Sequence, residues 1–418
     1  MSTTFSAPKG MTPGFFDAGA AKRLAFTEEE YRARQDRLRA LMRREGIDLL
    51  YVTSPDAVAY LHGFFCGWYK AQGPMRYPQV YGTAIHAHSD KIIHFDHPTE
   101  APLLNEISCC PDVRYYPSRE GRINLDFILS ELGREGLLKG TVGLEFWSYL
   151  PNRAISEMFE RGFREKGCDV SDASAITREV RRVKSPAELE MIREAIRIAD
   201  IGHAAIQEYA RVGKTELEVM GEVTREMMKA GGELPALIHV FNVKPLVNGR
   251  PVATGHSMPT TRRIEPGHVL AADLCGVVNR YHGNVLRGFI FGDPPAKLVD
   301  LYEKSAGALD FAGKELRAGM TVRQVNDLLR GYCERTGLID EEGWVLGYEL
   351  GLSLPPDWVG DFYFNMHDTD YLDRVFEPGM VTNLEILFST DLIDTLFWGT
   401  DGMENPTTTP RKLFVLPA

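Results

Sequence analysis

The first third of the chain alternates between two periods of apolar residues. Between residues 26 and 45, apolar positions recur every three or four residues behind Thr27, which predicts a capped amphipathic helix. The run IDLLYVTS predicts a buried strand followed by a turn, and GTAIHAHSDKIIHFD predicts further strands. A helix near INLDFILSELGREG and a strand at TVGLEF continue the alternation. Such alternation is typical of a compact α/β domain, which we place at residues 1–175.

A second pattern begins in RRVKSPAELEMIREAIRIADIGHAAIQEYA. Ser185, Pro186 and Glu188 have the spacing of a capping box with proline in the first helical turn, so a long helix is predicted there. From Val269 onward the chain is mostly strand, interrupted by helices predicted near residues 298–316 and 322–336. These elements predict a second domain at residues 176–418. The predicted fold class is α/β (α+β).

Length and composition narrow the class of protein. A chain of 418 residues exceeds one ordinary core, which agrees with two domains. The net charge of −11 argues against a nucleic-acid partner. We find no apolar run that would span a bilayer, no secretory signal, and six scattered cysteines without a metal-binding spacing. We therefore expect a cytoplasmic protein with no membrane partner.

Three side chains are the candidates for catalysis. Asp273 and Glu385 each lie within an apolar predicted strand, where a carboxylate is costly unless it is paired or functional. We expect them on neighbouring strands facing one cavity, with Asn284 facing Asp273 across a tight turn. Two such acids cannot both ionise cheaply, which would give one base and one acid. His256, on a loop rich in glycine and proline, is either the proton carrier between them and the leaving group or a plain surface histidine.

Several motifs in order along the chain resemble the creatinase and prolidase family. They are FTEEEYRARQDRLRALMRREGIDLLYVTS, RRVKSPAELEMIREAIRIADIG, GHSMPTTRRIEPGHVL, FEPGMVTNLE and GMENPT. The resemblance implies a small creatinase-type N-terminal domain followed by a pita-bread domain, a curved sheet with the active site inside the curve. It also implies a homodimer in which the first domain completes a partner's site.

This chain differs from the family's peptidases at several of the positions that bind their metal ions. The family's two metal ions are held by two aspartates, a histidine and two glutamates, and these positions fall on Asp273, Asn284, Tyr348, Glu385 and a position near Leu392 or Ile393. Asp391 and Asp394 lie close to the last position. Too few hard or imidazole ligands remain for two divalent ions, so we expect no metal and no other cofactor. A second histidine of the peptidases falls on Pro355, which argues against peptidase activity.

The resemblance is closest to metal-independent branches. The catalytic histidine of creatinase falls on His256 and one substrate-binding glutamate on Glu385, but the other falls on Leu286, which argues against creatine. The segment GLSLPPDW is similar to that of ectoine hydrolases, where a reactive glutamate occupies the position of Asp273. The residues that we expect to bind a small-molecule substrate are Asn284, Tyr348, His367, Tyr281, His282, Trp358 and Trp68.

Three functions follow as hypotheses. The first is a metal-independent hydrolase that cleaves a C–N bond of a small non-peptide compound by acid–base catalysis. The second is a metal-independent lyase that breaks a C–C or C–heteroatom bond by elimination, for example with loss of formaldehyde from a lignin-like aromatic dimer. The third is a non-catalytic binding module.

Overall fold

The computed structural model describes residues 22–418 except 68–79, 119, 149 and 253–254. The chain divides into two compact units: the first ends at Arg181 and the second begins at Arg182. The sequence placed this division between residues 175 and 176, which both lie inside helix α6 (Ser174–Arg182). Within the described ranges, no helix has the length and apolarity that crossing a membrane requires.

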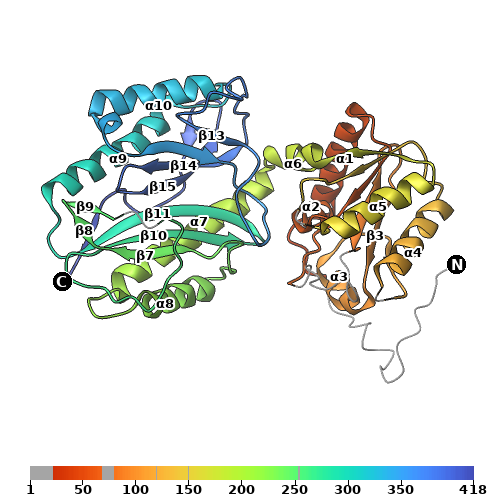
Figure 1. Cartoon of the computed structure of the whole chain (residues 1–418), viewed down its shortest axis with the longest axis horizontal. Coiled ribbons are helices and arrows are strands. Elements are labelled where there is room, and N and C mark those ends of the chain that lie inside the picture. Colours follow the sequence, from red (N-terminus) through yellow and green to blue (C-terminus); the bar gives the residue numbers. More distant parts are fainter. Residues whose placement is uncertain (1–21, 68–79, 119, 149, 253–254) are drawn as a thin grey trace. The chain divides into compact units, whose positions relative to one another are not determined.

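The first unit is built on a six-stranded mixed sheet with helices around it (Figure 1). The strand order is β4-β3-β2-β1-β5-β6, with β1 antiparallel to β2 and parallel to β5. In chain order its elements are α1 (Glu28–Arg44), β1 (Leu49–Val52), α2 (Pro55–His62), β2 (Gly82–His86), β3 (Ile92–Asp96), α3 (Ala101–Ile107), β4 (Val113–Tyr115), α4 (Gly121–Arg134), β5 (Thr141–Leu144), α5 (Arg153–Glu165), β6 (Asp169–Asp172) and α6.

Helix α2 replaces the turn that the sequence predicts after the first strand. Pro55 occupies its first turn, where a missing N–H is tolerated, and Gly63 ends it in the left-handed conformation with φ 88°. All six residues from Ala57 to His62 are buried. A helix without a polar face has no amphipathic period, so its pattern is indistinguishable from that of a short buried strand.

The second unit contains a nine-stranded sheet whose main path is β13-β12-β14-β15-β11-β10-β7. Strand β16 pairs with β15, strand β17 pairs with β11, and β8 and β9 form a separate small hairpin. In chain order the elements are α7 (Pro186–Tyr209), α8 (Glu216–Lys229), β7 (Val240–Lys244), β8 (Leu246–Val247), β9 (Arg250–Pro251), β10 (Val269–Val278), β11 (Tyr281–Phe291), α9 (Ala296–Glu315), α10 (Val322–Thr336), β12 (Trp344–Tyr348), β13 (Tyr363–Asn365), β14 (Val381–Leu387), β15 (Leu392–Trp398), β16 (Met403–Glu404) and β17 (Phe414–Leu416).

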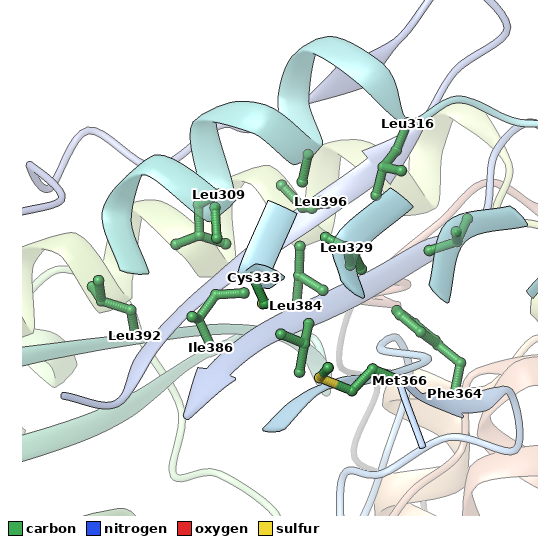
Figure 2. Packing of buried hydrophobic residues seen from close by; sticks show 14 of the residues in the cluster. Leu309, Leu316, Leu329, Cys333, Phe364, Met366, Leu384, Ile386, Leu392 and Leu396 are labelled. Carbon is green, nitrogen blue, oxygen red and sulfur yellow. The ribbon is translucent and has the colours of Figure 1, made fainter. Parts of the chain in front are cut away.

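Two pairs of helices cover one side of this sheet. Helices α7 and α8 pack on β7, β10 and β11, while α9 and α10 pack on β12, β14 and β15 (Figure 1). Figure 2 shows the second of these cores, in which Leu309 and Leu329 from the helices meet Leu384 and Leu396 from the strands. The capping box predicted at Ser185 and Glu188 is present at the start of α7. We call the opposite side of the sheet the inner face.

The long hairpin β10–β11 lies directly against helix α7. Gly276 and Gly283 are paired across the hairpin. A Cβ atom at Gly276 would lie 1.8 Å from the carbonyl oxygen of Ala195, and one at Gly283 would lie 2.8 Å from the backbone nitrogen of Ile196. Both positions therefore require glycine, because any side chain would push the hairpin off the helix.

The two halves of the sheet meet at a narrow seam. Strands β11 and β15 share one registered pair, Leu286 with Ile393. On the helix side of this seam, the fully buried guanidinium of Arg287 donates five hydrogen bonds, which is the full number of its N–H groups. Two go to the carbonyl oxygens of Leu286 and Ile393, and one goes to Asp394 Oδ1 at 2.7 Å. The remaining two acceptors are the carbonyl oxygens of Pro410 and Thr409.

Candidate active site

Asp273 and Glu385 lie in one row of the inner face. Asp273 pairs with Leu286, Leu286 with Ile393, and Ile393 with Glu385. Paired residues project to the same side of a sheet, so these four side chains share the inner face. Strands β11 and β15 separate the two acids, so the expectation of neighbouring strands was wrong. Of the two positions that the resemblance gives for the family's second glutamate, Leu392 and Ile393, it is Ile393 that shares this row with the acids.

Asn284 belongs to the adjacent row and does not directly face Asp273. It pairs with Cys275, two residues further along β10, so Asp273 and Asn284 are diagonal neighbours. This diagonal is within reach of side chains, and Asn284 Nδ2 donates a 2.5 Å hydrogen bond to Asp273 Oδ1. On β14, Asn383 Nδ2 donates to Asn284 Oδ1 at 3.2 Å and to Glu385 Oε1 at 2.7 Å. Two amides therefore link the two carboxyl groups across three strand steps.

The direction of this amide chain follows from the donors at its start. The backbone N–H of Tyr348 can act only as a donor, and it points at Asn383 Oδ1 from 2.8 Å. The nitrogen of Asn383 must then face Asn284, whose oxygen accepts and whose nitrogen is left to face Asp273. Each carboxyl group consequently receives one amide N–H and keeps one oxygen for other partners.

The two amide side chains of the site are more deeply buried than the two acids and the tyrosine. Asn284 and Asn383 are 0% exposed, whereas Asp273 and Glu385 each keep 8% exposure and Tyr348 keeps 9%. The acids and the phenol are therefore the members that a small molecule can touch. Asn284, predicted to bind substrate, is sealed and acts on the site through Asp273.

Both acids are held in a state that favours protonation. Burial raises the pKa of Asp273 to about 7, against the lowering effect of the hydrogen bond from Asn284. Burial, and then the negative charge of Asp273, raise the pKa of Glu385 to about 8. The proton of Asp273 is thus lost first, and its charge keeps the remaining proton on Glu385 near neutral pH.

Tyr348 is oriented toward Glu385 by a buried indole. Trp358 Nε1, which can only donate, donates to the Tyr348 hydroxyl oxygen at 3.2 Å. The hydroxyl proton is then available for Glu385, and a hydrogen bond from Tyr348 lowers the pKa of that acid against the effect of burial. His282, on the inner face two residues before Asn284, packs its ring 6.0 Å from that of Trp358. Burial lowers the pKa of His282 to about 3, so its imidazole is neutral.

Three predicted residues are not members of this hydrogen-bonded group. His256 is exposed on the loop before β10 and, across the part of the chain that the structure describes, makes no hydrogen bond or ion pair with either acid. His367 is also exposed, and its backbone N–H donates to Asn365 Oδ1. Tyr281 projects to the helix side, where its hydroxyl donates to Glu188 at 2.8 Å. Trp68 lies outside the described residues.

Two residues near the acids, Asn383 and His239, were missed by sequence reasoning. A third, Asp391, was named from the sequence only as a neighbour of the family's second glutamate position. Asn383 stands two positions before Glu385 on a strand, so the period of two already placed both on one face. Asp391, just before β15, raises the pKa of both acids by its charge. His239, before β7, accepts a hydrogen bond from the backbone of Cys275 at 3.2 Å, and burial lowers its pKa to about 4. Nothing in the sequence around His239 indicates that position.

The donor set does not fit two divalent cations. Asp273 and Glu385 are the carboxylates that remain, and their oxygens already accept amide hydrogens. Asp394 is turned to the helix side, where Arg287 and Arg411 bind it. Among the described residues, no three histidine, cysteine or acidic side chains gather in a way that would hold a metal ion. Divalent ions prefer several anionic or imidazole ligands, so we derive no catalytic step through a metal.

A curved sheet with two linked acids on its inner face, which follows a smaller α/β unit in the chain, defines a protein of the creatinase and prolidase class. Residues 190–403 match metallopeptidase family M24, and residues 34–183 match the creatinase/prolidase N-terminal domain. The chain belongs to family M24.

Individual relatives agree with this assignment. The chain is 25% identical over 413 residues to an ectoine hydrolase from Halomonas elongata, covering 94% of this chain and 98% of that protein. It is 27% identical over 267 residues to a Xaa-Pro dipeptidase from Pyrococcus furiosus, covering 62% and 73%. Among solved structures, a Xaa-Pro dipeptidase from Bacillus anthracis aligns with a TM-score of 0.76 at 20% identity, covering 92% of this chain and all of that one. The last comparison shows the fold.

The raised pKa values predict how stability depends on pH. A carboxyl group that binds its proton more tightly when folded stabilises the folded state at low pH, and this contribution is lost as pH rises. For Asp273 and Glu385 the loss begins near the unfolded values of about 4 and is complete above the folded values of about 7 and about 8. We therefore expect the second unit to be less stable at pH 9 than at pH 5, and E385Q to reduce that difference by roughly a few kcal/mol.

Urea unfolding of the wild type and E385Q at both pH values measures this difference. Asp96 in the first unit also has a pKa raised by burial to about 7, and comparing two variants removes its contribution. Identical pH dependence in the two proteins would contradict the assignment.

Proposed function

We propose that this protein is a metal-independent hydrolase that cleaves a C–N bond in a small non-peptide compound. The observation that carries the proposal is the amide-linked pair Asp273 and Glu385, with pKa values of about 7 and about 8 in the place of a metal centre. Acids with pKa values near the working pH are the most effective for proton transfer. The named relatives are hydrolases, an ectoine hydrolase and Xaa-Pro dipeptidases, which supports an enzyme over a binding module.

The two acids take opposite parts in the reaction. Ionised Asp273 accepts a proton from water through the oxygen that Asn284 leaves free, and the water oxygen bonds to the carbon of the C–N bond. Glu385 gives its proton to the departing nitrogen, so the bond breaks without a free anion. The hydroxyl of Tyr348 lies beside Glu385 and holds it in place. The homodimer and the cytoplasmic location stay predictions.

Removal of metal tests the proposal. We expect purified protein treated with EDTA and dialysed to keep its full rate on a panel of amidines, cyclic amidines and amides that begins with ectoine. Loss of the rate on chelation, with recovery on addition of Mn²⁺, Co²⁺ or Zn²⁺, would return the protein to the metal-dependent peptidases.

The same reactions run in H₂¹⁸O separate hydrolysis from elimination. Hydrolysis places one labelled oxygen on the product carbon, whereas the lyase hypothesis predicts none. Binding without turnover across the panel would favour the binding module.

A further inference from the structure

A buried lysine stands on the inner face beside the acids and has no part in the proton transfer described above. Lys244, at the end of β7, pairs with Val269, while Asp273 pairs with Val240 of the same strand. Positions 269 and 273 are four residues apart on β10, so Lys244 and Asp273 project to the same face. The Lys244 side chain is 10% exposed.

Asp391 holds this ammonium near the two acids. Lys244 Nζ donates to Asp391 Oδ2 at 2.9 Å, and the charge of Asp391 acts on both Asp273 and Glu385. Asp391 has φ 35°, and Ser389 before it has φ 66°, both in the left-handed region that non-glycine residues seldom adopt. Strained backbone of this kind is concentrated at functional sites, where the surrounding structure imposes it.

The ammonium has more donors than the protein uses. A lysine carries three N–H groups, and among the described residues the one acceptor within hydrogen-bond distance of Lys244 Nζ is Asp391. A largely buried cation is stable only when its remaining donors are also satisfied. Two donors therefore stay available on the side of the sheet where substrate would bind.

We propose that Lys244, held by Asp391, anchors a carboxylate of the substrate while the C–N bond lies at Asp273 and Glu385. This inference rests on the proposed function and narrows its substrates to compounds that carry both groups. A carboxylate fits better than a phosphate, because a dianion would meet the negative charge of Asp391 with a single lysine to offset it.

Matched ligands test the anchor without any need for turnover. The probes are ectoine and its carboxamide, and proline and prolinamide, each pair differing in one carboxylate. We expect the wild type to bind the carboxylate member about 10- to 100-fold more tightly by calorimetry, the effect of charge-assisted hydrogen bonds. K244M abolishes this preference and K244R keeps part of it.

Replacing Asp391, the ion-pair partner of Lys244, is expected to change the affinity for carboxylates in the opposite direction. In D391N the ammonium is no longer shared with a carboxylate, so we expect carboxylates to bind about 3- to 10-fold more tightly. Asparagine tolerates a positive φ, so the backbone is preserved. K229M is the matched control, since Lys229 is exposed and pairs with Glu226 on helix α8. It should leave every affinity unchanged.

Two results overturn the anchor. One is a wild type without preference for carboxylates, which includes no binding of any of them. The other is a change of the same sign in K244M and D391N, as expected of a purely structural pair. Failure of the proposed function is distinct, since it appears as full turnover in D273N or E385Q and leaves the carboxylate preference in place.

Discussion

Replacing Asp273 by asparagine or Glu385 by glutamine is expected to lower kcat by about a hundred- to ten-thousand-fold, the usual contribution of a positioned acid or base. Each change preserves shape, because an amide oxygen at position 273 still accepts from Asn284 and one at position 385 still accepts from Asn383. What is lost is the ability to take up or release a proton. The double variant should be no more than about tenfold slower than the slower single one, because the pair acts as a unit.

The pH profile assigns the two roles separately. Wild-type kcat/KM should fall below about 7 as Asp273 becomes protonated and above about 8 as Glu385 loses its proton. D273N removes the acidic limb from the residual activity, and E385Q removes the basic one. Profiles that keep both limbs in both variants would contradict the assignment.

Substitutions of exposed residues serve as controls for these changes in kcat. D401N and E377Q make the same chemical changes at exposed positions of the same unit and should leave kcat unaltered. H256A should lower kcat at least tenfold less than either active-site change, because the exposed His256 makes no hydrogen bond or ion pair with the acids in the described part of the chain. A carboxylate variant that turns over within threefold of the wild type would exclude the mechanism.

Replacing Arg287 by methionine is expected to destabilise the second unit by about 3–5 kcal/mol, the range for breaking a buried ion pair from one side. The change removes all five hydrogen bonds of the guanidinium, including those to the two carbonyl oxygens at the seam. It also leaves the fully buried Asp394 with one guanidinium, that of Arg411.

Urea unfolding followed through the tryptophans of the second unit measures this loss. R197M is the matched control: Arg197 is half exposed, pairs with Glu194 one helical turn away, and should contribute less than about 1 kcal/mol. Equal unfolding free energies for R287M and R197M would show that the seam does not depend on the buried guanidinium.

The sequence was most informative where structure is local. The hairpin β10–β11, the capping box of α7 and helices α9 and α10 were predicted close to their observed bounds, because turn residues, caps and apolar periods are encoded within a few positions. Helix α2 was missed because all its central side chains are buried and leave no periodic signal.

The sequence predicted which residues form the site but not how they are arranged in space. Asp273, Asn284, Tyr348 and Glu385 were identified, and the structure links them through hydrogen bonds and charge. Their spacing depends on the order β10-β11-β15-β14. The central step of this order, β11 with β15, pairs Leu286 with Ile393, more than a hundred residues apart in the sequence.

The contact of Gly276 and Gly283 with helix α7 has a bearing on catalysis from the far side of the sheet. A Cβ atom at Gly276 would meet only helix backbone, and one at Gly283 would meet the backbone and the Ile196 side chain. The distance between the hairpin and the helix is therefore set largely by backbone atoms that cannot move aside. Asp273 and Asn284 lie on that same hairpin: Asp273 is three residues from Gly276, and Asn284 directly follows Gly283. A single methyl group at either glycine would push the hairpin away from helix α7 and move Asp273 relative to Glu385 on β14. The rate of catalysis would then change although no residue in contact with the substrate is altered.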